Sequence, residues 1–407
     1  MPTSGTTALS AEVQALYDGE FLMQGQSMVY HDQFCDLRMQ MDGQRGRTYN
    51  FPILESGQPN YTPLDELEDV SAQQMRANEI VVTLYEYGGA IEITKLVAAT
   101  SYVDVAKQAA YVNGYNVAES VDFVARATFG QGSRVFRQNS RASRSVFAGK
   151  STAADRLTPA FIERLTLFTR TLKMPLYDDG CVSTVLHPFP FYDLLQASDV
   201  RNLAINNAYS EILFNGEIAY WSGLRIIVSA NAKAFWGSGA NDATNVLATT
   251  LATAGSVADT NLKVASVTTV VAGMWIAIND GVESGNTWYD TNELFQVTTV
   301  GTAGAGGTGL DGFVLDPGPG DGGGLRYAHA SGTTVTTKNS TYPMVVFGPN
   351  SVTKVASDFT GPYGETIVSG PHDRLLRFLT FAWYLIAGYQ RTRNGWLFRG
   401  EVGSSES

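Results

Sequence analysis

The longest apolar run of the chain lies near its C-terminal end, in residues 375–401, LLRFLTFAWYLIAGYQRTRNGWLFRGE. Its uncharged part, residues 378–390, is 13 residues long, whereas a membrane-spanning helix needs about 20. The many aromatic residues favour a strand, and Asn394-Gly395 is a strong hairpin signal before WLFRGE. The pattern therefore predicts a long strand buried on both faces for most of its length, a tight turn and a short final strand, with no membrane anchor.

A second strand pattern lies upstream, in residues 46–96. The sequence NEIVVTLYEYGGAIEITKL contains two strand-like runs, and Gly88-Gly89 between them indicates a turn. The segment predicts a long hairpin. Because two-stranded hairpins are marginal in water, this one is expected to need a partner surface. Residues 1–45 are polar and mixed, which predicts an extended arm with one short helix in residues 10–22.

Helical periodicity is clearest in residues 100–129, where alanine and aliphatic residues recur at three- and four-residue spacing. The pattern predicts one long helix there, capped at Gly130. Thr158-Pro159 starts a second helix, since threonine is a good N-cap and proline suits the first helical position. The runs CVSTVL and GEIAYWSGLRIIVSANAKAF then predict a buried strand and a strand pair.

The composition changes after Phe235. Residues 241–338 are rich in Thr, Val, Gly and Ala, and short strand-like runs such as MWIAIND, LFQVTTV and GFVLD follow one another at regular spacing. The segment carries nine acidic and three basic residues, which is -6 of the net charge of -11. Since TYPMVVFG resumes the earlier apolar character, we predict a small all-β module inserted between two halves of one domain.

The overall composition narrows the class of protein. Charged residues make up 16% of the 407 residues, against roughly 25% in an ordinary soluble domain. This low fraction indicates that much of the surface is buried against other subunits, and the net charge of -11 argues against a nucleic-acid-binding protein. Two cysteines, Cys35 and Cys181, are too few for a disulfide framework, and the first residues do not form a signal peptide.

No motif of the sequence predicts a catalytic, cofactor-binding or metal-binding residue. GAGGTG in residues 304–309 matches a nucleotide-binding pattern, but a strand follows it where that site needs a helix. Asp311, Asp316 and Asp321 do not have the spacing of a known calcium loop, so acidic surface turns are the favoured interpretation. The four histidines are far apart in sequence and lack the spacing of metal ligands.

Three local motifs and the order of the predicted elements point to a family. The motifs are VLHPFPFYDLL, NGEIAYWSGLRIIVS and GPYGETIVSG. Together with the arm, the acidic hairpin, the long helix and the aromatic C-terminal strand, they resemble the major capsid proteins of tailed bacteriophages, and among them the coliphage N4-like family. The resemblance implies an α+β chain with the Hong Kong 97 (HK97) capsid fold and an inserted all-β domain.

The resemblance also implies a domain organisation. Residues 1–45 would be the N-terminal arm and residues 46–96 the extended loop (E-loop). The peripheral domain would comprise residues 97–180, with the spine helix, and the C-terminal strand region 371–407. The axial domain would be formed by residues 181–240 and 339–370, with the β-rich domain 241–338 inserted between them.

The function implied by the resemblance is structural. Such a chain self-assembles as hexamers and pentamers into an icosahedral shell, the virion capsid, after synthesis in the bacterial host cytoplasm. Portal, separate scaffolding and decoration proteins would be its partners, and double-stranded DNA would be packaged inside without sequence-specific binding. A phage tail or host-surface β-rich adhesin is the alternative, although it should lack the long alanine-rich helix. An enzyme with an unrecognised site is a further rival.

Two segments of opposite charge are candidate contacts between subunits. They are four acidic residues of the predicted hairpin and four arginines after the long helix: Asp65, Glu66, Glu68 and Asp69, and Arg134, Arg137, Arg141 and Arg144. Like charges repel within each segment, so each is expected to have a partner of opposite charge. Because the resembled fold lays the extended loop of one subunit over its neighbour, we expect the acidic loop to contact the neighbour's arginines. Two unrelated, solvated loops are the alternative.

Overall fold

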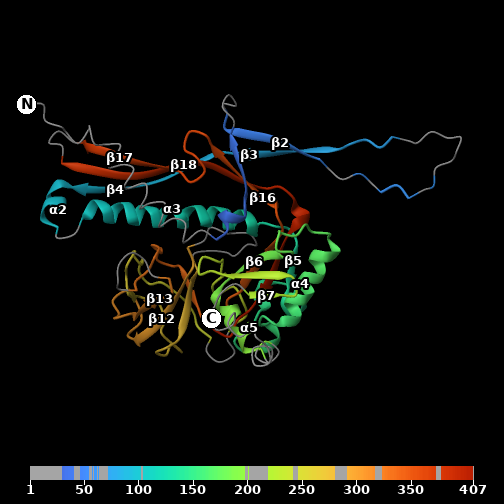
Figure 1. The fold of residues 1–407 in the computed structure, drawn as a ribbon. Helices are drawn as coiled ribbons and strands as arrows, with labels where there is room; N and C mark the ends of the chain where they lie inside the picture. The colour runs from blue at the N-terminus through green and yellow to red at the C-terminus, as the bar shows by residue number, and fades with distance from the viewer. Residues whose placement is uncertain are drawn as a thin grey trace, which may run out of the picture. The chain divides into compact units, whose positions relative to one another are not determined.

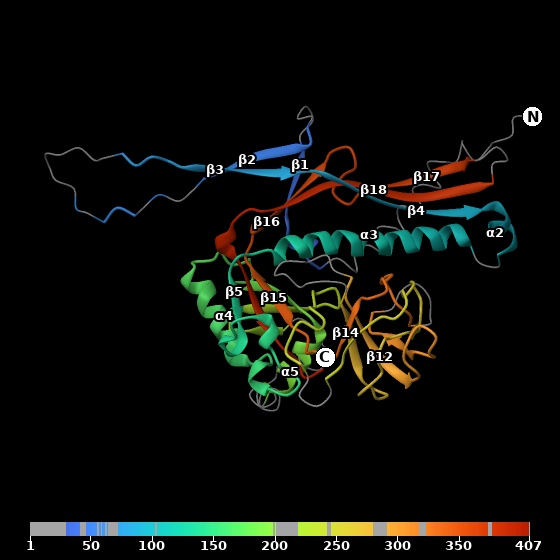
Figure 2. The ribbon, with the colours of Figure 1, turned by 180° about the vertical axis from the view of Figure 1, so that it is seen from behind.

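The computed structural model describes these residues: 30–40, 46–54, 57, 59–61, 63, 72–101, 104–197, 200, 219–241, 246–279, 291–316, 323–372 and 377–406. The chain forms two compact units. The first comprises Met1–Val124 with Val352–Thr392, and the second comprises Ala125–Ser351 with Arg393–Ser407. Figures 1 and 2 show the ribbon from opposite sides.

A five-stranded sheet is the centre of the first unit. Its strands, in spatial order, are β1 (Asp36–Gln40), β16 (Val352–Ser357), β18 (Phe378–Arg391) and β17 (Glu365–His372), with β4 (Tyr85–Thr94) also paired to β18. The pairing of β1 with β16 is parallel and the others are antiparallel. The long C-terminal strand is confirmed. Buried and half-buried residues alternate along most of β18, so the predicted burial on both faces is wrong.

The long helix α3 (Val105–Gly130) runs beside β4 and β18 (Figure 1). Val117 and Val121 of this helix pack with Trp383 and Leu385 of β18, which joins helix and sheet in one small core. The predicted helix is therefore confirmed. Thr100, the first residue of the predicted helix, instead ends a separate short helix, α2 (Lys95–Thr100), for which the Thr94 hydroxyl accepts a hydrogen bond from the Val97 amide.

A two-stranded hairpin, β2 (Thr48–Leu54) with β3 (Ala77–Thr83), completes the first unit. The predicted turn at Gly88-Gly89 is wrong, because both glycines lie inside β4 and pair with Tyr384 and Trp383 of β18. A β-carbon on Gly89 would stand 2.8 Å from the Trp383 indole nitrogen. Glycine at this position therefore allows the indole to approach the strand rather than marking a turn.

A six-stranded sheet forms the base of the second unit. Its strands, in spatial order, are β5 (Val135–Arg137), β19 (Leu397–Val402), β15 (Tyr342–Phe347), β6 (Val182–Leu186), β8 (Leu224–Val228) and β7 (Ala219–Trp221). The helices α4 (Pro159–Thr171) and α5 (Pro188–Gln196) contribute to the same hydrophobic core. Thr158 caps α4 with its side chain and His187 caps α5, which confirms the predicted start of the first of these helices. Short 3-10 turns follow α3: η2 (Gln138–Ser140), η3 (Arg144–Val146) and η4 (Ala153–Asp155).

The predicted C-terminal hairpin is wrong. Asn394 and Gly395 belong to a 3-10 turn, η5 (Asn394–Trp396), and the strands on its two sides lie in different sheets. β18 pairs with β4, β16 and β17, whereas β19 pairs with β15 and β5. The Asn-Gly pair thus marks a bend at which the chain leaves one unit for the other.

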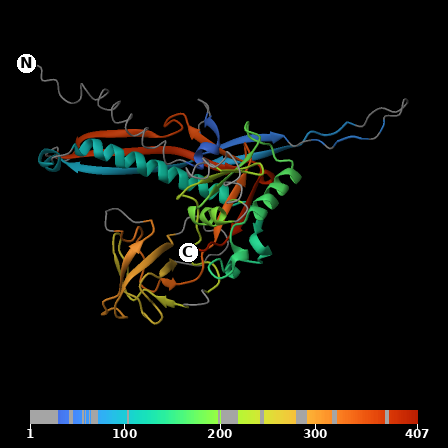
Figure 3. The same cartoon turned by 60° about the horizontal axis from the view of Figure 1, so that its bottom comes forward.

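The predicted all-β module is a six-stranded sheet with a hydrophobic core of its own (Figure 3). Its strands, in spatial order, are β10 (Asn261–Leu262), β13 (Leu310–Val314), β12 (Glu293–Val300), β11 (Trp275–Asn279), β14 (Thr334–Thr336) and β9 (Ala248–Thr250). The glycine-rich GAGGTG segment connects β12 with β13 and no helix follows it, as expected. The two ends of the module meet, since the Gly239 amide donates to the Asn339 carbonyl at 2.6 Å.

The observed division of the chain differs from the predicted domain boundaries. The prediction placed residues 339–370 in one domain and residues 371–407 in another. In the structure the changes fall at 351/352 and 392/393, because β16 and β17 pair with β18 while β15 pairs with β19. The predicted arm, residues 1–45, also contains a strand of the first sheet, β1, which pairs with β16.

Candidate subunit-contact sites

The four acidic candidates, Asp65, Glu66, Glu68 and Asp69, lie outside the described residues. In sequence they fall between β2 and β3, whose register pairs Thr48 with Thr83 and Leu54 with Ala77. The expectation that they contact a neighbouring subunit therefore stays a prediction.

Three of the four basic candidates have acidic partners within their own chain. Arg137 and Arg144 each place a guanidinium nitrogen 2.8 Å from a different carboxylate oxygen of Glu401. Glu401 is completely buried in β19, and Arg399 of the same strand lies 3.0 Å from it. Burial lowers the pKa of Arg399 to about 10, while the negative charge of Glu401 acts in the opposite direction. The Glu401 carboxylate thus joins the segment that carries Arg137 and Arg144 to strand β19.

The third arginine, Arg141, forms a two-point ion pair with Asp155. Its Nε and one terminal nitrogen each lie 2.8 Å from an Asp155 oxygen. Asp155 also accepts hydrogen bonds from the Asn139 side chain and from the Ala148 amide. Although burial opposes it, hydrogen bonding to Arg141 and these other donors lowers the pKa of Asp155. The carboxylate therefore stays ionised and fixes the loop around it.

Arg134 differs from the other three candidates. It is exposed, and its guanidinium donates to the Gly395 carbonyl at 3.3 Å. Arg144, by contrast, is buried and also stacks over the Phe235 ring at 3.6 Å. Of the four candidates, Arg134 is consequently the one whose charge a partner could reach without breaking an ion pair described here.

A buried polar network anchors the start of the described chain within the first unit. The backbone amides of Tyr30 and His31 donate to the Asp122 carboxylate of α3, and the His31 ring lies 3.1 Å from it. The Lys354 ammonium of β16 donates to Asp32 at 2.6 Å. Tyr389 of β18 donates to the same carboxylate at 2.7 Å. Segment 30–40 is therefore tied to both the helix and the sheet.

The protonation states in this network follow from burial together with the neighbouring charges and hydrogen-bond donors. Although burial opposes it, the charge of His31 and the hydrogen bonds from His31 and Tyr30 lower the pKa of Asp122. Burial, reinforced by the negative charge of Asp32, raises the pKa of the Tyr389 hydroxyl and of the Cys35 thiol. The tyrosine is thus held as a hydrogen-bond donor, and the thiol is held in its unreactive form.

Large apolar side chains are exposed at several places on the first unit. The most exposed are at the hairpin, the helix α2 and the connection from β16 to β17: Tyr61 at 90%, Met75 at 79%, Phe359 at 77% and Leu96 at 73%. Single exposed apolar side chains are normal on a protein surface, so these residues are candidates for a contact surface only.

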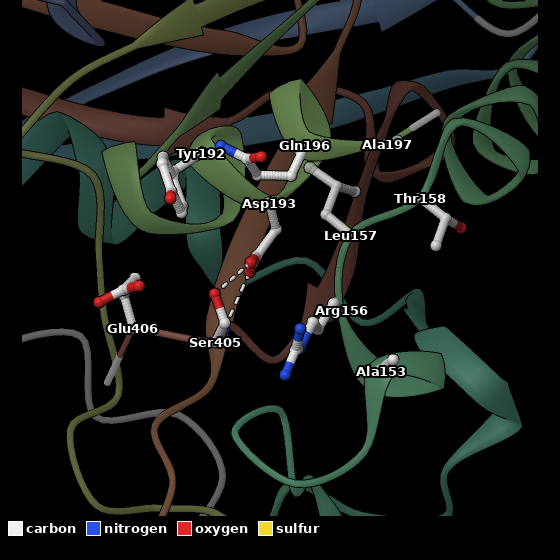
Figure 4. Close-up of a pocket in the computed structure, with 10 residues that line it drawn as sticks. All are labelled: Ala153, Arg156, Leu157, Thr158, Tyr192, Asp193, Gln196, Ala197, Ser405 and Glu406. Carbon is white, nitrogen blue, oxygen red and sulfur yellow. Dashed lines mark hydrogen bonds between the residues drawn. The ribbon is translucent and has the colours of Figure 1, made fainter. Parts of the chain in front are cut away.

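A shallow hollow of about 410 Å³ lies in the second unit (Figure 4). Asp193 of α5 points into it and accepts hydrogen bonds from the amide and hydroxyl of Ser405, so the C-terminal residues occupy that carboxylate. Arg156 on its other side donates to the Gly149 and Lys150 carbonyls. The polar groups of Asp193 and Arg156 are therefore engaged in contacts within the chain.

No group of three or more His, Cys, Asp or Glu side chains within the described ranges is arranged to hold a metal ion. In that same part of the chain, no helix is both long and apolar enough to cross a membrane.

Sequence reasoning missed the acidic partners, Glu401 and Asp155, and the network around Asp32. The ion pair between Arg137 and Glu401 joins positions 264 apart, which no local pattern reveals. One signal was present, since Arg399 and Glu401 stand at alternate positions of the otherwise apolar strand LFRGEV. Charged residues facing one side of a buried strand need partners there.

Comparisons with known proteins show the fold. No family model matches the sequence, and no curated protein matches it. Among solved structures, the capsid of Ralstonia phage GP4 has a TM-score of 0.57 at 10% identity, over 92% of this chain and 88% of that one. The capsid structure of cyanophage P-SCSP1u has a TM-score of 0.50 at 12% identity, over 90% and 86%. The capsid of cyanophage Pam1 has a TM-score of 0.50 at 14% identity, over 94% and 93%.

The chain therefore has the fold of these phage capsid structures. The predicted fold class, α+β with an HK97-like capsid fold, is confirmed.

Proposed function

We propose that this chain is a major capsid protein of a tailed bacteriophage, which self-assembles into the icosahedral shell around the genome. One observation carries the proposal. The fold likeness to phage capsid structures extends over about nine tenths of both chains, so it is not confined to one module of this chain.

The exposed apolar residues support assembly. Tyr61, Met75 and Phe359 are each more than three quarters exposed, so a neighbouring subunit that covered them would remove apolar surface from water. The hairpin β2–β3 has a buried base, where Phe51 and Val82 pack with Val355, while Leu54 further along it is half exposed. A neighbouring subunit that covers these residues would stabilise the hairpin.

The domain names follow from this proposal. Of residues 46–96, predicted as the extended loop, the part that carries the hairpin β2–β3 would form that loop, since β4 belongs to the five-stranded sheet, and α3 would be the spine helix. The first unit would contain the peripheral domain, the sheet of the second unit would be the axial domain, and the β-rich module would be an insertion in it. Membership of the N4-like group rests on the three sequence motifs.

The partners would be copies of the same chain, arranged as hexamers and pentamers. Portal, scaffolding and decoration proteins, enclosed double-stranded DNA, and assembly in the bacterial cytoplasm belong to the same proposal. The role is structural rather than enzymatic. A tail or host-surface adhesin is not favoured, because such a protein was expected to lack the long alanine-rich helix, and α3 is present.

Electron microscopy of the purified chain tests the proposal. The chain would be expressed alone and together with a separate scaffolding protein, and its fold checked by circular dichroism. Closed shells of uniform size are the expected result. A folded chain that remains a monomer or a small ring under both conditions would contradict the proposal.

A further inference from the structure

The five-stranded sheet of the first unit packs on α3 with one face and leaves part of its other face open to water. Trp383 and Leu385 of β18 pack with the helix. Since strand residues alternate between the two faces, Ala382 and Tyr384 point the other way. On that other face, the neighbouring strands β4 and β17 expose three glutamates and one isoleucine that is 43% exposed: Glu86, Glu92, Glu365 and Ile367.

The strand register gathers these residues on one surface. Ile367 pairs with Ala382, which also pairs with Ala90, and residues that pair directly across antiparallel strands share a face. The next row on one side contains Glu365, and the next row on the other side contains Glu92. Each of these rows lies about 6.6 Å from the row of Ile367. In these rows, all of which belong to the described part of the chain, there is no lysine or arginine. We call this surface the acidic sheet face.

The helix α4 of the second unit exposes a surface of opposite charge. Leu167 is 60% exposed, and the exposed residues Arg164 and Arg170 stand three positions before and after it. Residues three positions apart in a helix are separated by about 60° around the axis and about 4.5 Å along it, so both arginines flank Leu167. Glu163 is exposed on the same side, and Lys173 is exposed just beyond the helix. This basic helix face therefore carries three positive charges and one negative charge.

We propose that the basic helix face of one copy of the chain binds to the acidic sheet face of a second copy, with Leu167 on Ile367 and the two flanking arginines beside Glu92 and Glu365. Each surface has an exposed apolar side chain at its centre and charges on two sides, and the charges of the two surfaces are opposite. The spacing of the charges differs by only about 2 Å on each side, which long arginine side chains can cover.

The contact removes two exposed apolar side chains from water, which favours association. The acidic residues 65–69 of a neighbouring chain have the wrong charge for the acidic sheet face, whereas α4 has the right one. The inference rests on the proposed function in one respect, because it requires copies of the chain to associate.

Cross-linking between two cysteine variants tests the contact. One chain carries Leu167→Cys and the other carries Ile367→Cys, so a cross-link between these two positions must join two copies. The chains would be mixed at low salt, alone and with a separate scaffolding protein, and treated with a short bis-maleimide. Mass spectrometry then quantifies the peptide pair that contains positions 167 and 367. The cross-link should form, and it should weaken at about 1 M salt, because salt screens exposed charges.

Charge reversal makes the test specific. Adding Arg164→Glu and Arg170→Glu to the first chain should lower the yield of the cross-link by about fivefold or more. A fivefold change corresponds to about 1 kcal/mol, which is within the range for one or two exposed ion pairs. Adding Glu92→Lys and Glu365→Lys to the second chain should then restore most of the yield. Circular dichroism checks that each variant is folded.

The matched control reverses two exposed lysines that lie outside both faces, Lys107→Glu with Lys338→Glu, and should leave the yield unchanged. A cross-link that survives the arginine reversal unchanged, or one that is lost equally in the control, would overturn the proposal. Closed shells in the electron microscope without this cross-link would overturn the contact and leave the proposed function standing. Chains that remain monomeric both alone and with the scaffolding protein would contradict both.

Discussion

Lys354 donates a 2.6 Å hydrogen bond to Asp32, and both side chains are almost completely removed from water. The two residues are 322 positions apart, and their contact fixes the segment before β1 against β16. A buried charge without its partner is strongly unfavourable, whereas replacing the whole pair by apolar groups is often tolerated. Removing one partner of the pair is therefore expected to destabilise the first unit.

We expect Lys354→Met alone to lower the free energy of unfolding of the first unit by about 3–5 kcal/mol, since it leaves the buried Asp32 with only Tyr389 as a donor described here. The double variant Lys354→Met with Asp32→Leu should recover a large part of the loss. Urea unfolding followed by circular dichroism measures both. A double variant that is no more stable than the single one would contradict the prediction, because the loss would then not come from the unpaired Asp32 carboxylate.

The arginine segment gives a second prediction. Arg144→Ala leaves the buried Glu401 without one of its guanidinium partners and removes the contact with Phe235, so it should cost about 3 kcal/mol or more of unfolding free energy. Arg134→Ala, the matched control, removes an exposed side chain and should change stability by less than about 0.5 kcal/mol. Equal effects of the two substitutions would refute the structural role of the Glu401 cluster.

The ion pairs of Arg137 and Arg141 within the chain decide which arginine can test the predicted contact between the acidic loop and a neighbour's arginines. If Arg137 and Arg141 had no partners within the chain, reversing both to Glu would test this contact by blocking assembly without unfolding the chain. In the structure these changes would place acids beside the buried Glu401 and Asp155, so we now expect them to unfold the segment. Arg134→Glu is the informative substitution. It should weaken shell formation at low salt while the chain stays folded, and Asp65→Lys with Glu66→Lys should partly restore assembly.

Local sequence patterns predicted some elements correctly and others wrongly, and the difference has a physical reason. The strand Phe378–Arg391 and the helix Val105–Gly130 were predictable, because period and composition are properties of neighbouring residues. The hairpin predicted at Asn394-Gly395 does not form, because β19 pairs with Tyr342–Phe347, 50 to 60 positions earlier. Sheet membership depends on such distant pairing, as do the partners of Glu401, and a single sequence shows neither.

Acid sensitivity follows from His187 in the second unit. Burial lowers the pKa of His187 to about 3, from the ordinary 6.5. Between these pH values the unfolded chain binds a proton that the folded chain does not, so stability is full above pH 6.5 and falls as the pH drops toward 3. At about 1.36 kcal/mol per pKa unit, the loss reaches about 4–5 kcal/mol at most.

The variant His187→Asn isolates this effect. Asparagine keeps a side-chain acceptor for the Phe189 amide at the start of α5 but does not titrate. It should lower stability at pH 7, because contacts with the Trp236 and Tyr342 rings are lost, yet flatten the pH dependence between pH 4 and 6.5. Thermal unfolding across this range measures the slope. An unchanged slope would mean that other groups cause the acid sensitivity.

Removal of the β-rich module gives the last prediction. The chain enters and leaves the module at positions that are already hydrogen-bonded, since the Gly239 amide donates to the Asn339 carbonyl and the Asn339 amide donates to the Ala240 carbonyl. The module's apolar core, from Leu247 to Val335, is made from its own residues. Replacing residues 241–338 by a short linker should therefore leave the rest of the second unit folded, with a change in unfolding free energy of about 1 kcal/mol or less.

The control variant for this excision is a longer deletion that also removes residues on both sides of the module. Removing residues 235–341 also eliminates Phe235, which is 1% exposed, and its backbone pairing with Thr341. Loss of a buried phenylalanine alone costs about 3–5 kcal/mol, so this variant should fail to fold. If the proposed function holds, the shorter excision should still form shells visible by electron microscopy. Complete loss of soluble protein from that shorter excision would instead place the module in the structural core of the second unit.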